Sequence, residues 1–194
     1  MKHLVIIGSG NIGQIVHWYA TLSKDYLKVW DIKCHIDNVE EYVIEPDDVF
    51  ICADVKPLDR MDHSAIIRKK GGIFVNVIHP SANIAPSAKM GTGIVVGAFS
   101  TISINTIIND DVIIQDHCNI GHDGIIEAAS HLYVGVKLCG RNKIGTLSSV
   151  FTGAVVYPDV KVGEKCVVGA GSVVSRKVKD GETVLGNPAK KIEL

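Results

Sequence analysis

The sequence predicts a small parallel α/β domain followed by a parallel β-helix. Strand-like and helix-like runs alternate over the first eighty residues, and from Ile84 onward an aliphatic residue returns every six residues. The 19 glycines and the aromatic share of 6% also favour a turn-rich scaffold over a helical bundle.

The first half of the chain has the pattern of a parallel sheet covered by helices. Strands are expected over residues 3–8, 27–32, 48–54 and 71–78, and helices over residues 12–24 and 63–70. Short apolar runs between polar, glycine-containing segments are typical of buried strands, and their alternation with helices is typical of a parallel sheet. We therefore expect a first domain over residues 1–80.

The repeat in the second half is the most specific feature of the sequence. The first position of sixteen consecutive six-residue units, from Ile84 to Val174, is always Ile, Leu, Val or Met. The fifth position is mostly small or β-branched, as at Ala88, Ser100, Thr106, Val112, Ser130, Ala154 and Ser172. Such a period leaves no apolar face on an α-helix. Three units can instead close one triangular coil with its aliphatic side chains inside, and such coils must stack to bury that face. The expected second domain spans residues 81–194, including a C-terminal tail.

Composition and charge exclude several classes of protein. Twenty basic and 21 acidic residues give a net charge near zero, which argues against a nucleic-acid partner. The apolar run at residues 4–7 is too short for a signal sequence or a membrane span. Five cysteines without CxxC spacing are expected to be reduced thiols of a cytoplasmic protein.

Two histidines on the repeat are candidates for chemistry. His122 is third in its unit, so its side chain is expected to face outward, and Asp123 follows it. Histidine suits a general base because its ordinary pKa lies near neutral pH. His131 lies half a coil farther on, so the two histidines can meet only if a second subunit contributes one of them. His117 has no further ligand at suitable spacing, so no metal site is expected.

A glycine-rich pattern, GSGNIG at residues 8–13, follows the first expected strand. Backbone N–H groups at such a strand-to-helix turn can hold a phosphate. Asp31 lies eighteen residues past Gly13, near the spacing of a ribose-binding acid, and is expected at the end of the second strand. By itself the pattern fits a dinucleotide-dependent dehydrogenase, but about eighty residues are too few for a full dinucleotide-binding fold.

The repeat units and the ending VLGNPAKKI, residues 184–192, resemble the hexapeptide-repeat acyltransferases. Four further stretches, residues 4–13, 49–54, 78–93 and 120–140, resemble one subgroup of that family. This subgroup contains the bacterial sialic-acid O-acetyltransferases and the UDP-4-amino-sugar N-acetyltransferases. The resemblance covers essentially the whole chain.

The resemblance implies an N-terminal Rossmann-like domain, a left-handed β-helix and a homotrimer with acetyl-CoA between neighbouring prisms. An acetyl group would pass to an amine or hydroxyl of a nucleotide-activated or sialic-acid-type sugar. His122 would be the general base and Asp123 would raise its basicity. The remaining implied contacts are His131, Thr152 and Ala170 with acetyl-CoA, and Gly10, Asn11, Ile12, Asp31, Ile32 and Ala53 with the sugar substrate.

One departure and two alternatives stay open. Ala53 and Asp54 stand where the family usually has an Ile-Gly-Asp or Ile-Gly-Asn run, which leaves the sugar and the nucleotide undetermined. The choice of N- or O-transfer is also open, because both reactions need the same base. A γ-carbonic-anhydrase-like zinc enzyme would need a third histidine that is not evident. A non-catalytic sugar-nucleotide-binding module is the other alternative, and the intact His122–Asp123 pair argues against it.

Overall fold

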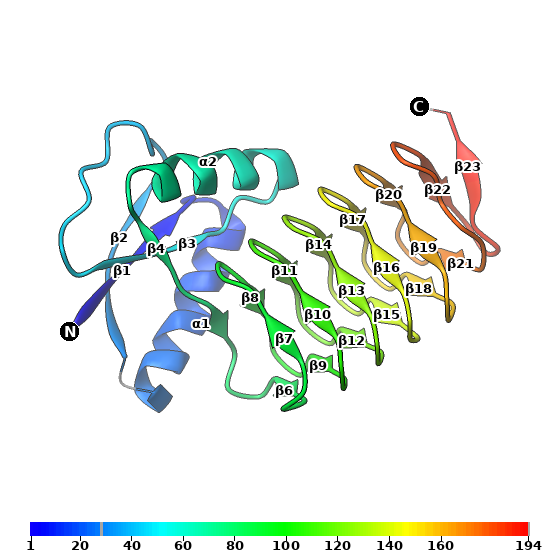
Figure 1. The fold of residues 1–194 in the computed structure, drawn as a ribbon, viewed down its shortest axis with the longest axis horizontal. Coiled ribbons are helices and arrows are strands. Elements are labelled where there is room, and N and C mark those ends of the chain that lie inside the picture. The colour runs from blue at the N-terminus through cyan, green and yellow to red at the C-terminus, as the bar shows by residue number, and fades with distance from the viewer. Residues whose placement is uncertain (28, 194) are drawn as a thin grey trace.

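A computed structural model describes residues 1–27 and 29–193 of the chain. Two bodies share one long axis, a small α/β part at the N-terminal end and a stack of short-stranded coils that runs to the C-terminus (Figure 1). The α/β part consists of β1 (Lys2–Ile7), α1 (Asn11–Leu27), β2 (Trp30–Ile36), β3 (Asp48–Cys52), α2 (Pro57–Lys69) and β4 (Ile73–Phe74). Its four strands are parallel and lie in the order β2-β1-β3-β4.

The coils form a three-walled prism, as the six-residue period predicts. The first wall contains β5 (Val77–Ile78), β8 (Val95–Val96), β11 (Ile113–Ile114), β14 (His131–Leu132), β17 (Ser149–Val150), β20 (Val167–Val168), β22 (Thr183–Leu185) and β23 (Lys190–Ile192). The second wall contains β6 (Asn83–Ile84), β9 (Thr101–Ile102), β12 (Asn119–Ile120), β15 (Lys137–Leu138), β18 (Val155–Val156) and β21 (Val173–Val174). The third wall contains β7 (Lys89–Met90), β10 (Ile107–Ile108), β13 (Ile125–Ile126), β16 (Lys143–Ile144) and β19 (Lys161–Val162). Neighbouring strands are parallel except for the β22–β23 pair.

The aliphatic first positions of the repeat units fill the prism, which confirms their predicted role. From Val96 to Val174 each of them is at most 2% exposed, and Ile84 and Met90 pack against the same core. Each strand pairs with the strand eighteen residues away, as Ile114 does with Leu132. Three units therefore make one coil, and the stacked aliphatic side chains supply most of its stabilisation.

The turns between walls need a left-handed backbone at the fourth position of each unit. Every sixth residue from Gly93 to Gly171 has a positive φ, and ten of these residues are not glycine. Most L-residues pay about 1 kcal/mol for this conformation. Continuous burial of the aliphatic first positions, the inward stripe of the prism, offsets this repeated local strain.

The α/β part is attached to the outer face of the first wall. Helix α1 lies between the four-stranded sheet and this wall, because Val16 and Ala20 share one buried cluster with Leu4 of the sheet and with Val95 and Ile113 of the wall. Helix α2 covers the other face of the sheet through Ile67, which packs with Phe50.

Several predicted boundaries shift in the structure. The second strand, expected over residues 27–32, is found at Trp30–Ile36, and residue 28 lies outside the described residues. The fourth expected strand, residues 71–78, divides into β4 of the sheet and β5 of the prism. The second helix begins earlier than expected, at Pro57, a residue type well suited to a first helical turn. Neither helix in the described part of the chain has the length and apolar composition needed to cross a bilayer.

Replacing one inward residue should test the stacking argument. Ile120 is 1% exposed in the prism core, so Ile120→Ala is expected to lower the free energy of unfolding by about 2–5 kcal/mol. Ile73, 59% exposed on β4, provides the matched control, and Ile73→Ala should change stability by about 0.5 kcal/mol or less. Urea unfolding at one fixed protein concentration measures both, and equal losses would contradict an inward-facing stripe.

Candidate active site

His122 and Asp123 form an exposed pair on the edge between the second and third walls. The pair follows β12, and His122 Nδ1 lies 2.7 Å from Asp123 Oδ2. The two side chains are 44% and 46% exposed, so His122 faces outward as predicted. Asp123 occupies a left-handed corner position, with a φ of 54°.

Neighbouring coils hold this pair in place. Asn105, one coil earlier, donates from Nδ2 to Asp123 Oδ1 over 3.1 Å. The hydrogen bonds from His122 and Asn105 hold the pKa of Asp123 below its ordinary value, so the carboxylate is charged. A carboxylate accepts hydrogen bonds only, so Nδ1 of His122 carries a proton that it donates to Asp123, and Nε2 is the ring nitrogen that Asp123 does not engage.

Gly140, one coil later, makes room for the imidazole ring. A Cβ atom at this position would lie 3.0 Å from Nε2 of His122 and 3.2 Å from Cδ2. Any side chain there would displace the ring. No local pattern in the sequence indicates the contact between Gly140 and His122, because the two residues are brought together only by the coil period.

A second candidate site is a cavity of about 430 Å³ at the carboxyl ends of β1 and β3. Four predicted substrate-binding residues, Gly10, Asn11, Ile12 and Ala53, line it together. The glycine-rich turn therefore forms a site, as expected at the carboxyl end of a parallel sheet. The full lining is Gly8, Ser9, Gly10, Asn11, Ile12, Asp37, Ala53, Asp54 and Val55.

The other two predicted substrate residues, Asp31 and Ile32, do not reach this cavity. Asp31 and Ile32 lie at the start of β2, where they pair with His3 and Leu4 of β1. The cavity lies at the other end of β2, where Gly8 donates its N–H to Ile36 O. The five to six residues of extended strand between Asp31 and the end of β2 span roughly 17–20 Å. The expectation that Asp31 ends the second strand is therefore wrong, because the strand continues to Ile36.

Asp37 directly follows β2 and is therefore the acidic residue at the strand's end, the position that was expected for Asp31. Its carboxylate accepts hydrogen bonds from Ser9 N, at 2.8 Å, and from Ser9 Oγ, at 2.6 Å. These bonds from Ser9 lower the pKa of Asp37. Since the carboxylate already occupies one N–H of the turn, the turn offers less to a phosphate than the bare glycine pattern suggests.

Asp54 provides a second carboxylate at the cavity. Its Oδ2 lies 2.8 Å from His63 Nδ1 and accepts from Cys52 Sγ at 3.2 Å. No lysine or arginine is among the described residues that line the cavity. The site therefore suits hydrogen-bond donors such as hydroxyl and N–H groups better than an isolated anion.

The structure places His131 against the α/β part, with Nδ1 3.1 Å from the carbonyl oxygen of Val55. Its side chain is fully buried on β14, at the junction of the first wall with the α/β part. Burial, followed by the nearby charge of Arg60, lowers the pKa of His131 to about 3. The imidazole is thus neutral and has no free surface for a side-chain contact with acetyl-CoA.

Arg60 crosses the same junction from α2 and is also fully buried. Its guanidinium donates to Asp54 O at 2.5 Å, to Asp111 O at 2.7 Å and to Ala129 O at 2.7 Å. Burial lowers the pKa of Arg60 to about 10, so it stays charged at neutral pH. The sequence gives no sign of this role, since the arginine lies in an ordinary polar helix.

Thr152 and Ala170 are exposed on a different edge, between the first and second walls. In a single chain they do not lie on the edge that carries His122. The structure thus brings the predicted base and its acid together on one edge, gathers four predicted substrate residues around the cavity, and places Thr152 and Ala170 on another edge of the prism.

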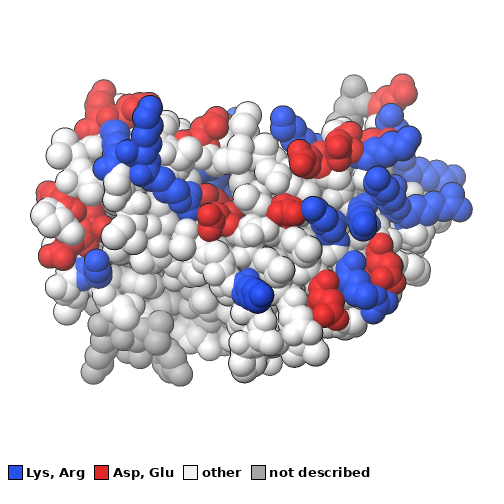
Figure 2. All heavy atoms as spheres, in the orientation of Figure 1, with Lys and Arg blue, Asp and Glu red and all other residues white. Residues whose placement is uncertain are grey.

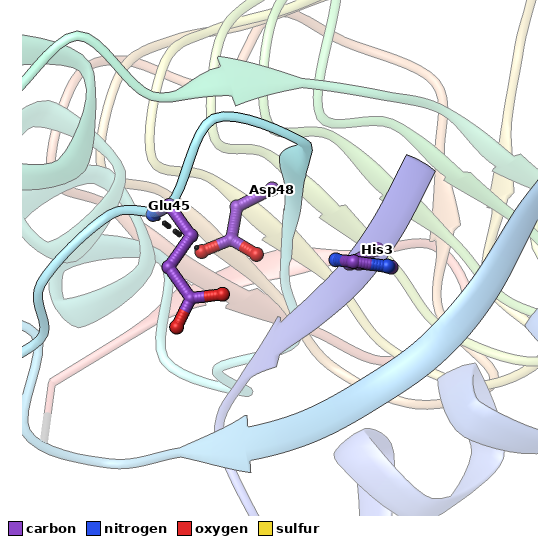
Figure 3. Close-up of side chains that lie close together, drawn as sticks. All are labelled: His3, Glu45 and Asp48. Carbon is purple, nitrogen blue, oxygen red and sulfur yellow. Dashed lines mark hydrogen bonds between the residues drawn. The ribbon is translucent and has the colours of Figure 1, made fainter. Parts of the chain in front are cut away.

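One group of side chains has the composition of a metal site. His3, Glu45 and Asp48 lie together at the amino ends of the strands, away from the glycine turn (Figure 3). Lys33 Nζ already contacts Glu45 Oε2 at 2.9 Å and Asp48 Oδ1 at 2.8 Å. An ammonium group therefore supplies the positive charge that a metal ion would bring, and we assign no metal to this group.

Comparison with solved structures gives close matches over the full chain. A histidine-to-asparagine mutant of perosamine N-acetyltransferase from Caulobacter crescentus, in complex with CoA and GDP-perosamine, superimposes with a TM-score of 0.91 at 27% identity, covering 100% of this chain and 98% of that one. The acetyltransferase domain of PglB from Neisseria gonorrhoeae, in complex with acetyl coenzyme A, gives a TM-score of 0.89 at 28% identity, covering 98% and 99%. These structures confirm the resemblance to hexapeptide-repeat sugar acetyltransferases, and the fold is consistent with their left-handed β-helix.

Curated relatives match about half of the chain. Serine acetyltransferase from Synechococcus elongatus is 33% identical over 117 residues, which is 56% of this chain and 41% of the relative. Galactoside O-acetyltransferase from Lactococcus lactis is 29% identical over 105 residues, which is 50% of this chain and 48% of the relative. The chain spans between a quarter and a half of the length of the curated relatives it matches. No protein-family model matches the sequence.

Burial of a neutral His131 predicts a pH-dependent stability. The folded pKa of about 3 lies below the ordinary value near 6.5, so the unfolded chain binds more protons between these values. Stability is therefore lost as the pH falls through this window, by up to about 1.4 kcal/mol per pH unit. Urea unfolding at pH 7.5 and 5.5 should show a loss of about 1.4 kcal/mol in the wild type that His131→Gln lacks. An equal loss in both proteins would contradict a buried neutral imidazole.

Proposed function

We propose that this protein is an acetyl-CoA-dependent acetyltransferase that acts on a nucleotide-activated sugar, with an amine as the favoured acceptor. The observation that carries this proposal is the exposed His122–Asp123 pair on a prism whose full length matches sugar-nucleotide N-acetyltransferase structures. Those structures are described with CoA and GDP-perosamine. The sequence match to a galactoside O-acetyltransferase covers only half of this chain, so that relative supports a hydroxyl acceptor less strongly.

The same proposal divides the chain into two functional parts. Residues 1–80 would form a Rossmann-like domain that holds the nucleotide sugar in the cavity beside Gly10. Residues 81–194 would form a left-handed β-helix that carries the base and binds acetyl-CoA. The parallel sheet with a glycine turn at its carboxyl end and the eighteen-residue coils support this division. A cytoplasmic location fits the expected reduced cysteines.

In the proposed mechanism His122 acts through Nε2. This nitrogen would take the proton of the acceptor amine or hydroxyl as the acceptor attacks the thioester carbonyl of acetyl-CoA. The new bond joins the acetyl carbon to the acceptor nitrogen or oxygen, the carbon–sulfur bond breaks, and the proton passes to the departing thiolate. Asp123, held by Asn105, would keep the imidazole oriented and stabilise its charged form, much as an aspartate does in a catalytic triad.

Exposed basic side chains provide a surface for the phosphates of CoA. Figure 2 shows Lys and Arg gathered toward the prism end that carries the C-terminus. A groove of about 340 Å³ on the third wall contains Lys143, Lys161 and Lys177, together with the carboxylates of Glu127, Glu164 and Asp180. Lys143 is already paired with Glu127 at 2.7 Å, which leaves the other two amines as the stronger candidates.

A homotrimer would complete the site. Thr152 and Ala170 lie on one edge of the prism and His122 on another, so an acetyl-CoA bound along the first edge needs a histidine from a neighbouring chain. Exposed apolar side chains beside that edge support such an interface. Trp18 is 54% exposed, Phe99 is 64% exposed and stacks on His117, and Val134 is 39% exposed.

Loss of the base should abolish turnover without loss of binding. His122→Asn is expected to reduce thiol release from acetyl-CoA by at least about 10²-fold with UDP- or GDP-linked 4-amino sugars, because the acceptor then keeps its proton. Calorimetry should show that acetyl-CoA still binds. His3→Asn, a histidine at the far end of the sheet, is the control and should retain activity.

Other outcomes separate the alternatives. Full turnover by His122→Asn would remove His122 as the base. Binding of both ligands by the wild type without any turnover would favour a non-catalytic sugar-nucleotide-binding module. Zinc in the purified protein, with hydration of carbon dioxide, would favour the carbonic-anhydrase-like reading.

Asp37 and Asp31 provide a paired test of the nucleotide-sugar site. Asp37→Asn is expected to raise the KM for the nucleotide sugar about tenfold, because it weakens the hydrogen bonds that hold Ser9 at the cavity. Asp31→Asn should leave this KM within about twofold, since Asp31 lies at the other end of β2. Steady-state kinetics measures both, and the reverse ranking would place the substrate elsewhere.

A further inference from the structure

His131 makes two hydrogen bonds that only one neutral form can satisfy. Nδ1 lies 3.1 Å from the carbonyl oxygen of Val55, and Nε2 lies 3.0 Å from the amide nitrogen of Gln115. A carbonyl only accepts, so Nδ1 carries the proton and Nε2 accepts from the Gln115 amide. The ring is further fixed by stacking on Tyr133, with centroids 4.0 Å apart.

The bond to Val55 connects His131 with the cavity beside the glycine turn. Ala53, Asp54 and Val55 form one side of that cavity, and we call these three residues the cavity strap. Arg60 holds the carbonyl of Asp54, and His131 holds the carbonyl of Val55. Two successive carbonyls of the cavity strap are thus fixed by buried groups.

The same two groups tie the cavity strap to the prism. His131 belongs to β14, and Arg60 also bonds to the carbonyls of Asp111 and Ala129 on two successive coils. The position of the cavity strap is therefore set relative to the prism, and so is the substrate cavity that it borders.

We propose that His131 is a positioning residue for the nucleotide sugar, acting through the cavity strap, and does not contact acetyl-CoA through its side chain. This inference rests on the proposed function. The side chain is fully buried, so acetyl-CoA has no access to it in the described arrangement. Burial and Arg60 lower its pKa to about 3, so it also cannot act as a second general base at neutral pH.

The decisive variant is His131→Phe, which keeps a ring against Tyr133 but removes both hydrogen bonds. The freed Val55 carbonyl should let the cavity strap shift, so the KM for the nucleotide sugar is expected to rise about tenfold. The KM for acetyl-CoA should stay within about twofold, because no acetyl-CoA contact is lost. His3→Phe, at the opposite end of the sheet, is the matched control and should change neither constant.

A milder variant keeps the test decisive if His131→Phe fails to fold. Gln115→Met removes the donor to Nε2 while the histidine stays, so the KM for the nucleotide sugar should rise by a smaller factor in the same direction. Calorimetric titration of each substrate alone should reproduce both changes as changes in Kd. This readout separates ligand positioning from a general loss of stability, which would weaken both substrates together.

Three results would overturn the inference. They are a rise confined to the KM for acetyl-CoA, an equal rise in both constants, and no change in either. Each of them requires a wild-type enzyme that turns over, so it leaves the proposed function intact. Absence of turnover by the wild type on every nucleotide sugar would instead be a failure of the proposed function, and nucleotide-sugar binding would still report on His131.

Discussion

The prism depends on one constraint, which is that every eighteen-residue coil must return its aliphatic side chains to the interior. Because the coils stack in register, residues eighteen apart lie in rows along each edge. The edge that carries His122 shows the consequence. Asn105 below it and Gly140 above it, neither of them near in sequence, hold the His122–Asp123 pair and make room for the imidazole ring. Core packing thus determines the geometry of a polar site that contains no core residue.

The junction between the two parts depends on a different kind of interaction. A buried guanidinium is costly unless it is well hydrogen-bonded, and each of the three nitrogens of Arg60 donates to a backbone carbonyl of the cavity strap or of two coils. Carbonyls impose direction, which apolar contacts such as Val95 with Leu4 do not. The apolar cluster therefore stabilises the contact between the two parts, and the buried polar groups set the position of the cavity relative to the prism.

The sequence predicted the features that a repeat or a restricted residue type marks, and missed those set by strand ends and by docking of the two parts. The six-residue period predicted the prism, its inward stripe and the outward direction of His122, because the same physical demand recurs in every coil. The glycine turn was also found, since its backbone geometry restricts residue type. Asp37 was missed because the end of β2 is a boundary, and boundaries depend on pairing with β1. The burial of His131 depends on where the α/β part docks, and no local pattern encodes that position.

The separation of the predicted contacts has a mechanical consequence under the proposed function. The cavity lies beside the first wall, whereas His122 lies on the edge between the second and third walls, so the sugar would meet the histidine of another chain. A small tilt of the α/β part on its own prism would then move the acceptor relative to a base that does not move with it. Misplacement by about 1 Å can cost 10²-fold in rate. A junction fixed by directional bonds from Arg60 and His131 would limit that tilt, which gives a physical reason for burying polar groups so far from the reacting atoms.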